Sequence, residues 1–234
     1  MKILKWSLCI LTVLATIVAL FVLPDSVPVH FDISGTPDRW GSKYELLILP
    51  VVLIGCAYII DPIAKSYLKK AEDTENEKEK AELLSNAKVL NITSIVTMFL
   101  FFFMNIITLY NTYMLVTPNS NLPEFDIGRG VGVIMGITIV ILGNYMPKTR
   151  NNKTIGFRLP WTMYNDVTWH KSNKFSSYVL MIAGAIAALS SLLVEGEVGV
   201  IISSVAMILG ISICIIYAYI VYRNEKRKDN ERNN

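Results

Sequence analysis

Residues 90–116 read LNITSIVTMFLFFFMNIITLYNTYMLV, a run of 27 residues that contains no Asp, Glu, Lys or Arg. The hydrocarbon core of a bilayer is about 30 Å thick, and a helix needs about 20 predominantly apolar residues to cross it. A helix in the core of a soluble protein keeps one polar face, whereas this run is apolar nearly all the way round. Residues 90–116 therefore predict a transmembrane helix.

Five more runs of similar character lie on either side of it: Ile3–Leu23, Leu46–Ala64, Gly130–Met146, Ser177–Val194 and Val198–Tyr222. The composition agrees with this pattern, because 53% of the residues are hydrophobic and only 18% are charged. The end of the first run lacks the small residues that precede a signal-peptide cleavage site, so we expect this helix to be retained. The sequence predicts an all-α, polytopic integral membrane protein with six transmembrane helices.

Lys and Arg are unevenly distributed among the segments between the runs. Nineteen of the 22 lie at the two termini and in the segments 65–89 and 147–176, and the other connections hold only Arg39, Lys43 and Arg129. Because short cytoplasmic loops collect Lys and Arg, we expect both termini in the cytoplasm, an N-in/C-in topology. The expected location is the bacterial plasma membrane, with several passes through it.

The first outer loop, residues 24–43, is long for a simple connection, and long ordered loops tend to be functional. Three prolines and two glycines predict turns, and the alternation of Val27, Val29 and Phe31 with polar neighbours favours a short extended segment. Its polar and aromatic side chains would suit an amphipathic peptide that arrives from outside: His30, Asp38, Arg39 and Trp40. The competing interpretation is a surface cap without a ligand.

The second inner loop, residues 147–175, mixes basic and aromatic residues, so part of it is expected to pack against the helices or the lipid headgroups. The guanidinium of Arg158 suits a carboxylate, a phosphate or several carbonyls. It would belong either to a basic platform for a lipid headgroup or an acidic partner, or to a cap on a helix end. The candidate residues of this inner site are Asn144, Lys148, Gly156, Arg158, Pro160, Trp161, Thr162 and Trp169.

Small residues within the spans predict close helix packing. Gly128, Gly132 and Gly136 recur every four residues, as do Gly184 and Ala188 in the next run. In lipid, small residues at this spacing let two helix backbones approach each other. Mid-span in residues 90–116, Asn105 is expected to form a hydrogen bond between helices.

Catalytic chemistry finds little support. The two histidines, His30 and His170, fall on opposite sides of the membrane, so neither a zinc site nor a catalytic triad has enough partners. Asp166 is expected to form only a surface ion pair with His170. The three cysteines lie inside the predicted spans, where small apolar packing is their ordinary role: Cys9, Cys56 and Cys214. We expect no catalytic residue, no metal, no cofactor and no nucleic-acid partner.

Two segments resemble known membrane families. The outer loop, LPDSVPVHFDISGTPDRWGSK at 23–43, resembles a family of membrane segments without an assigned function. The stretches GNYMPK at 143–148 and IGFRLPWT at 155–162 resemble the SdpI family. That resemblance implies an immunity protein that protects the producing cell against a secreted peptide toxin, and that also holds a cytosolic repressor at the membrane. A small-solute or peptide transporter and a membrane-bound enzyme remain the alternatives.

The predicted organisation has four parts. Residues 1–64 form an N-terminal two-helix segment with the outer loop, and 65–89 a charged cytoplasmic loop. Residues 90–222 form a four-helix SdpI-like domain that includes the inner loop 143–175, and 223–234 a basic cytoplasmic tail. No Asp, Glu, Lys or Arg lies at a predicted bilayer centre, so the usual mark of an ion or proton path is absent.

Overall fold

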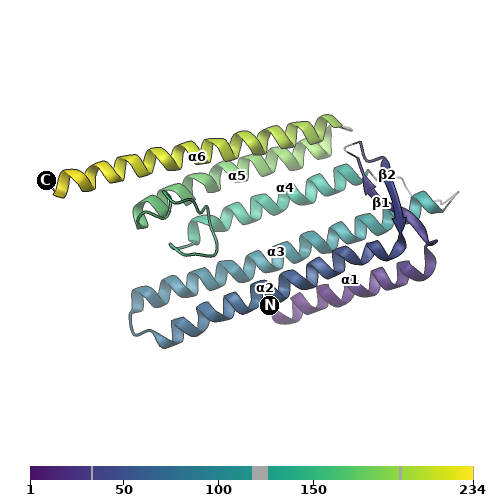
Figure 1. Ribbon diagram of the computed structural model, residues 1–234, viewed down its shortest axis with the longest axis horizontal. Coiled ribbons are helices and arrows are strands. Elements are labelled where there is room, and N and C mark those ends of the chain that lie inside the picture. Colours follow the sequence, from purple (N-terminus) through teal and green to yellow (C-terminus); the bar gives the residue numbers. More distant parts are fainter. Residues whose placement is uncertain (33, 118–125, 195–196, 234) are drawn as a thin grey trace.

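The computed structural model describes residues 1–32, 34–117, 126–194 and 197–233. Six long helices run roughly parallel or antiparallel to one another (Figure 1), and each is apolar and long enough to cross a membrane. They are α1 (Lys2–Val22), α2 (Ile48–Asp73), α3 (Glu77–Val116), α4 (Ile127–Tyr145), α5 (Asp166–Leu193) and α6 (Glu197–Asn233). The prediction of an all-α protein with six membrane-spanning helices is confirmed.

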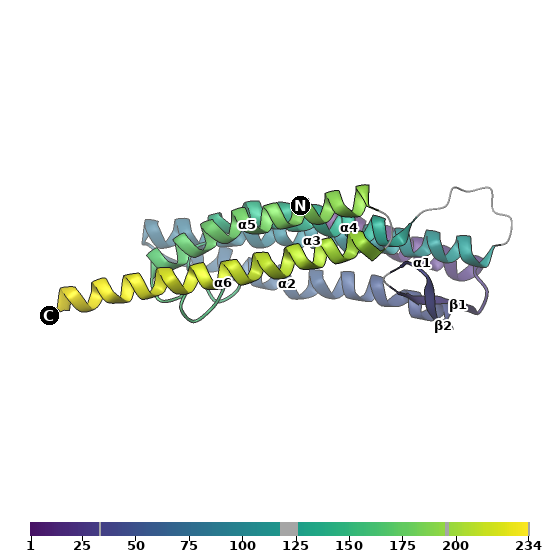
Figure 2. The same ribbon diagram turned by 90° about the horizontal axis from the view of Figure 1, so that it is seen from above.

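Four of the helices, α2, α3, α5 and α6, continue well beyond the predicted spans. Both α2 and α3 extend into the charged segment and meet at a short turn, where the side chain of Asn76 accepts hydrogen bonds from the backbone N–H groups of Lys78 and Glu79. The charged segment 65–89 is therefore mostly helical. In two perpendicular views α6 reaches past the other helices (Figure 2), because its polar tail stays helical.

The first outer loop folds into an antiparallel hairpin of β1 (Ser26–Phe31) and β2 (Pro37–Ser42), followed by the 3-10 helix η1 (Lys43–Leu47). The predicted extended segment is confirmed as β1. Val27 is fully buried and packs with Leu23 and Leu46, so the hairpin is fastened to the ends of the helices beneath it. Strand β2 has no alternating apolar pattern in its sequence, and most of its side chains are exposed.

The connections sort into two ends of the bundle. The hairpin lies at one end, and the turn between α2 and α3, the loop 149–165 and the C-terminus lie at the other (Figure 1). These are the groupings that the charge count predicts, although the direction in which the bundle crosses the membrane stays a prediction. The sequence also predicts turns in the short connections 117–128 and 195–197, but residues 118–125 and 195–196 of these lie outside the described residues.

The bundle has two halves, α1 to α3 and α4 to α6, which meet mainly through α3 and α4. In the second half the small residues pack as predicted. A Cβ atom built on Gly136 would lie 2.5 Å from the backbone nitrogen of Ala188 and 2.6 Å from the carbonyl oxygen of Gly184. The backbones of α4 and α5 are therefore in direct contact.

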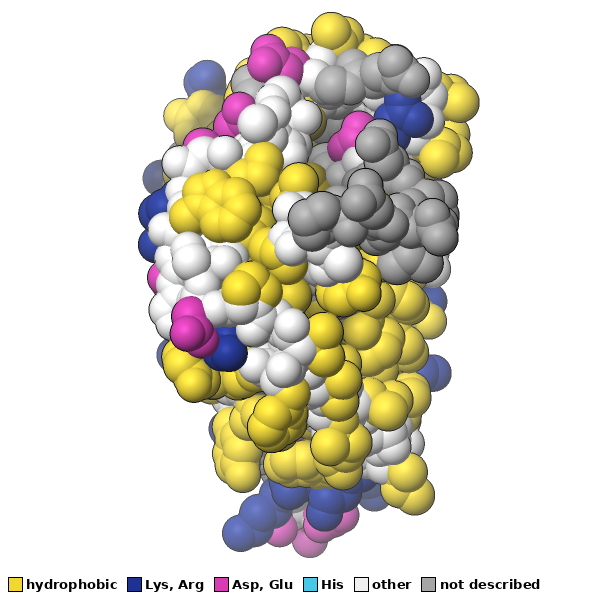
Figure 3. All heavy atoms as spheres, turned by 90° about the vertical axis from the view of Figure 1, so that its right-hand side faces the viewer, with side chains coloured by type: hydrophobic (Ala, Val, Ile, Leu, Met, Phe, Trp, Pro, Cys, Tyr) yellow, Lys and Arg dark blue, Asp and Glu magenta, His cyan; other side chains and the backbone are white. Residues whose placement is uncertain are grey.

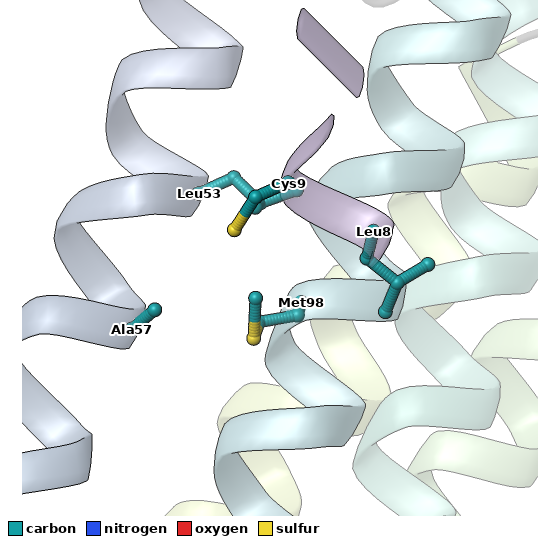
Figure 4. Close-up of a cluster of buried hydrophobic side chains, with 5 residues drawn as sticks. All are labelled: Leu8, Cys9, Leu53, Ala57 and Met98. Carbon is teal, nitrogen blue, oxygen red and sulfur yellow. The ribbon is translucent and has the colours of Figure 1, made fainter. Parts of the chain in front are cut away.

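A small hydrophobic cluster joins the three helices of the first half. Figure 4 shows its side chains, which point into the space between α1, α2 and α3: Leu8, Cys9, Leu53, Ala57 and Met98. Cys9 is free and buried, as are Cys214 and, in part, Cys56. The prediction that the cysteines serve as small packing residues agrees with this arrangement.

Polar side chains also lie on the buried face of α1. The hydroxyl of Thr16 donates to the side-chain oxygen of Asn105 at 3.3 Å, which confirms the predicted hydrogen bond between helices. Lys5, expected as a positive charge at the membrane surface, is instead 2% exposed. It forms an ion pair with Asp61, whose side chain keeps some exposure, and lies 3.3 Å from the side-chain oxygen of Asn91. Neither partner could be inferred from spacing, since the three residues come from three helices.

Candidate functional site

The loop 149–165 is tightly organised by buried side chains. Asn152 accepts from the backbone N–H groups of Thr154 and Ile155 and donates to the carbonyl oxygens of Arg150 and Ile155. Thr162, fully buried, lies within 2.8 Å of the carbonyl oxygen of Phe157. The loop therefore has a fixed shape rather than that of a solvated connection.

The first turns of α5 pack against this loop and form hydrogen bonds with it. Asn165 caps the helix and exchanges hydrogen bonds with Thr168, and Trp169 is buried and donates its indole N–H to the carbonyl oxygen of Thr149 at 3.0 Å. Gly156 has φ +107°, and an added Cβ there would lie 2.8 Å from Asn173 Oδ1 and 2.9 Å from the Trp169 ring. Only glycine fits this position, because it combines a positive φ with a close approach to two buried side chains.

Helices of the first half also reach this loop. The backbone N–H of Arg150 donates to the side chain of Asn86 at 2.9 Å, and the hydroxyl of Ser85 donates to the carbonyl oxygen of Lys148 at 2.6 Å. Tyr67 of α2 lies 2.9 Å from the hydroxyl of Thr154. The loop therefore joins the two halves of the bundle at its basic end.

The tail of α6 covers one side of the loop. Glu225 accepts from Lys228 at 2.9 Å and from Lys171 at 3.2 Å, and these bonds hold the pKa of Glu225 below its ordinary value. The hydroxyl of Tyr164 donates to Asp229 at 3.0 Å, which raises the pKa of that phenol. We call the loop 149–165, the first turns of α5 and the tail 223–233 the inner platform.

The residues predicted for the inner site fall into two groups: some hold the loop in shape, and the others are exposed. Gly156 and Thr162 are parts of the folded loop, Trp169 of α5 supports it, and Trp161 packs edge-on against Tyr219 of α6. The others are exposed on the surface of the platform or beside it: Asn144, Lys148, Arg158 and Pro160. Their role as a binding site stays a proposal.

The contacts of Arg158 and His170 differ from those that the sequence predicts, a helix cap for Arg158 and an ion pair with Asp166 for His170. The guanidinium of Arg158 donates to the carbonyl oxygen of Thr154 at 3.1 Å, so the carbonyl that it meets belongs to the loop and not to a helix end. The predicted surface ion pair between Asp166 and His170 is wrong, because within the described residues the two exposed side chains form no such pair. A spacing of four residues places two side chains on the same face of a helix, but it does not by itself bring their charged groups into contact.

At the opposite end the hairpin carries the predicted outer residues. His30 Nδ1 lies 2.6 Å from Asp38 Oδ1, and Arg39 donates to Glu45 at 2.8 Å. Trp40 is 53% exposed. The structure therefore joins His30 to Asp38 across the two strands, while Arg39 pairs with a residue of η1 that the sequence had not indicated. Figure 3 looks at this end, where charged, polar and hydrophobic side chains are mixed.

A cavity of about 810 Å³ lies under the hairpin between the two halves; we call it the outer groove. At the hairpin end the cavity is lined by polar side chains, and we call this part its mouth: His30, Asp32, Arg39 and Glu45. Its walls are mostly apolar, with several hydroxyl groups, and include Leu46, Leu49, Met104, Thr108, Val131, Met135, Ser191, Ser203, Ser204 and Met207. A second cavity of about 970 Å³ adjoins it and shares Phe31 and Ile127 with it.

Sequence reasoning missed this groove, because its walls come from five helices and the hairpin. It also missed Asp32, whose carboxylate accepts from the N–H and hydroxyl of Ser34 and from the N–H of Thr36. These donors, led by Ser34, lower the pKa of Asp32. An Asp followed two residues later by Ser-Gly is a turn signal that could have revealed the motif. Among the described residues, no three His, Cys, Asp or Glu side chains gather as a metal site would require.

Comparison with known families agrees with this architecture. Residues 7–54, which include most of α1, the hairpin and the start of α2, match a domain of unknown function, DUF1648. Residues 148–222, which include most of the inner platform and the two last helices, match the SdpI/YfhL protein family. Over these residues, about a third of the chain, the protein is similar to the SdpI/YfhL family.

Two curated proteins are also similar to this chain. The chain is 26% identical over 214 residues to the immunity protein SdpI of Bacillus subtilis, covering 91% of each chain. It is 54% identical over 43 residues to an uncharacterized protein of Archaeoglobus fulgidus, covering 18% of this chain and 24% of that one. No solved structure matches. The resemblance inferred from the two motifs is confirmed, and the protein is a multi-pass protein of the cell membrane.

Proposed function

We propose that this chain is a membrane immunity protein, which protects its host cell against a secreted, membrane-active peptide. The observation that carries the proposal is the outer groove, an apolar cavity with a polar mouth at the hairpin end of the bundle. Similarity over nearly the whole chain to a protein named for immunity supports the same function and favours a non-enzymatic role. The hairpin residues His30, Asp38, Arg39 and Trp40 would meet the peptide first.

The physical basis of protection would be capture. A membrane-active peptide has an apolar face that seeks the bilayer and a polar face that stays at its surface. The groove offers the same combination of surfaces within a protein, since its walls are apolar and its mouth carries His30, Asp32, Arg39 and Glu45. A peptide held there would be kept from disturbing the lipid around it.

The test begins with deletion of the gene in its own host. We expect the deletion strain to lose viability in spent medium from the parent strain, and protease treatment of that medium to restore growth. Reintroduced wild-type protein should restore survival, whereas the variant with Asp38→Ala and Trp40→Ala should not, at equal abundance in the membrane. Equal survival of the parent and deletion strains in medium from every growth stage would contradict the proposal.

We propose a second role for the inner platform, that of holding an acidic surface of a cytosolic partner such as a repressor. The tail of α6 supports this role through the arrangement of its charges. Glu225 and Asp229 bond to Lys171 and Tyr164. The basic side chains of the tail are exposed, and of these Lys228 also pairs with Glu225 and Arg227 with Glu231: Arg223, Lys226, Arg227, Lys228 and Arg232. Arg150, Lys153 and Arg158 add exposed positive charge from the loop.

Variants of Arg158 test this second role. We expect Arg158→Ala to be present at normal abundance and to preserve survival, but to abolish the change in transcription that spent medium induces in the parent strain. Arg158→Lys separates fixed geometry from charge, since a lysine cannot reproduce the planar guanidinium. If Arg158→Ala removes the protein from the membrane, Arg158 is a scaffold residue and the platform has no role in binding. A response that follows lipid composition instead would assign the platform to headgroups.

A further inference from the structure

The outer end of the bundle carries more negative than positive charge. Each of its three basic residues has an acidic partner: Arg39 with Glu45 at 2.8 Å, Lys43 with Asp25 at 3.1 Å and Arg129 with Asp126 at 3.5 Å. The partners of Asp32 that the structure describes are all uncharged donors. The excess charge at the mouth of the outer groove is therefore negative and lies on Asp32.

The position of Asp32 is fixed by its own turn. Three donors from Ser34 and Thr36 hold one carboxylate oxygen at 2.6 to 2.9 Å, and the side chain remains exposed. The lowered pKa of Asp32 favours the ionised carboxylate at neutral pH. An exposed carboxylate that faces the groove without a basic partner would attract a cationic group on whatever enters it.

The dimensions of the groove limit the occupant. Along α4 its lining runs from Ile127 to Ile139, which corresponds to about 18 Å of helix, or just over half of the hydrocarbon thickness. On this wall the space beside Gly132 is taken by Ser191 of α5, so an occupant would contact the apolar side chains of Val131 and Met135. The volume of about 810 Å³ would take the side chains of one helix face rather than a whole helix.

We propose that the outer groove binds a hydrophobic peptide helix with a positive charge at its outer end, placed beside Asp32. This inference rests on the proposed immunity function and specifies the chemistry of its peptide. A peptide in the membrane has to satisfy its backbone polar groups internally, so it enters as a helix. Its ammonium or guanidinium group then remains at the polar mouth while its apolar face packs on the walls.

Synthetic peptides provide the probe. Three dye-labelled helices of Leu and Ala, which differ only in a single outer Lys, Gln or Glu, are added to the full-length protein in nanodiscs of zwitterionic lipid. We expect the Lys peptide to bind about two- to fivefold more tightly than the Gln peptide, the range of a solvent-exposed ion pair. The Glu peptide should bind most weakly, and added salt should reduce the differences.

Asp32→Asn tests the charge without disturbing the turn, because an amide oxygen can accept the same hydrogen bonds from Ser34 and Thr36. In this variant the Lys and Gln peptides should bind equally. The matched control is Glu197→Gln, an exposed acid at the same end that does not line the groove and should leave the preference unchanged. A preference for Lys that persists in Asp32→Asn would overturn the inference.

Blocking the groove separates this inference from the proposed function. Ser204→Trp adds a large side chain to the groove from an exposed position, and Ser212→Trp adds one to the same helix outside it. We expect only Ser204→Trp to prevent binding. If all three peptides bind equally and Ser204→Trp blocks them, the groove is a peptide site and the charge inference is wrong. If no peptide binds and the groove retains co-purified phospholipid, both proposals for this groove fail.

Discussion

The side-chain oxygen of Asn173 accepts the backbone N–H of Phe157 at 2.8 Å, so the first part of α5 holds the turn made at Gly156. The amide nitrogen of Asn173 donates to the carbonyl oxygen of Trp169 at 3.0 Å, and Trp169 in turn reaches Thr149. One asparagine thus links the middle of the loop to the helix that follows it. The shape of the inner platform depends on how closely these groups approach one another.

Gly156→Ala should therefore lower stability by about 1–3 kcal/mol, the cost of a strained backbone position, with an added clash against Asn173 and Trp169. Gly35→Ala is the matched control: its φ is +81°, but the nearest side chain would lie at an ordinary 3.5 Å. Thermal unfolding in detergent should show a larger loss for Gly156→Ala. Equal losses would mean that the close approach at Gly156 relaxes without cost.

The packing of α4 against α5 gives a second prediction. Gly136→Ala places a methyl group against the backbone of Ala188, which cannot move as a side chain can, and should cost about 1–3 kcal/mol. At Gly55 of α2 an added Cβ meets nothing within 4 Å, so Gly55→Ala should be neutral or stabilise the helix by up to about 1 kcal/mol. Membrane abundance and thermal unfolding of the two variants would measure the difference. A well-tolerated Gly136→Ala would contradict the close packing.

The ion pair between Lys5 and Asp61 gives a third prediction. Asp61→Asn leaves a buried ammonium group without its counter-charge and should destabilise the protein by about 3–5 kcal/mol. Replacing both residues with apolar ones, Lys5→Met and Asp61→Leu, should recover most of this loss. Asp73→Asn, at an exposed position at the end of α2, is the control. If the double variant were as unstable as the single one, the pair would have another role.

The tail of α6 should detach from the inner platform in acid. Because the pKa of Glu225 in the folded protein lies below the ordinary 4.5, its contribution to docking is complete above that value. The contribution is lost as the pH falls through the lowered pKa and the carboxylate gains a proton. Spin labels at Asn151 and Asn230 should move apart over this range in the wild type. Glu225→Gln should remove this pH dependence, and an unchanged transition in that variant would assign it to another group.

The direction of insertion can be tested by labelling from outside the cell. In a variant without native cysteines, a Cys at Ser34 should react with an impermeant reagent, whereas one at Asn76 or Asn151 should not. Asn151 is the suitable inner position because it is exposed, while the neighbouring Asn152 is buried in four hydrogen bonds of the loop. Labelling of Asn151→Cys from outside would reverse the N-in/C-in orientation.

The amino-acid sequence by itself determined the six spans, the sorting of loops between two ends and the close packing near Gly136. Each of these depends on local composition or on a helical repeat. The length and hydropathy of a segment identify a transmembrane helix, and the number of Lys and Arg residues indicates on which side of the membrane a loop lies. A four-residue spacing of small residues identifies the face by which a helix packs on its neighbour. The resemblance to the SdpI family also followed from local motifs.

Only the tertiary structure decided which side chains meet. Lys5 joins Asp61, Asn86 reaches the backbone of Arg150, and Asp32 lies at the mouth of a groove whose walls come from both halves of the bundle. The residues that meet here lie far apart along the chain, and no repeat in the sequence records which of them are neighbours. A buried polar group accepts any partner of suitable geometry, so the identity of that partner is set by how the helices pack.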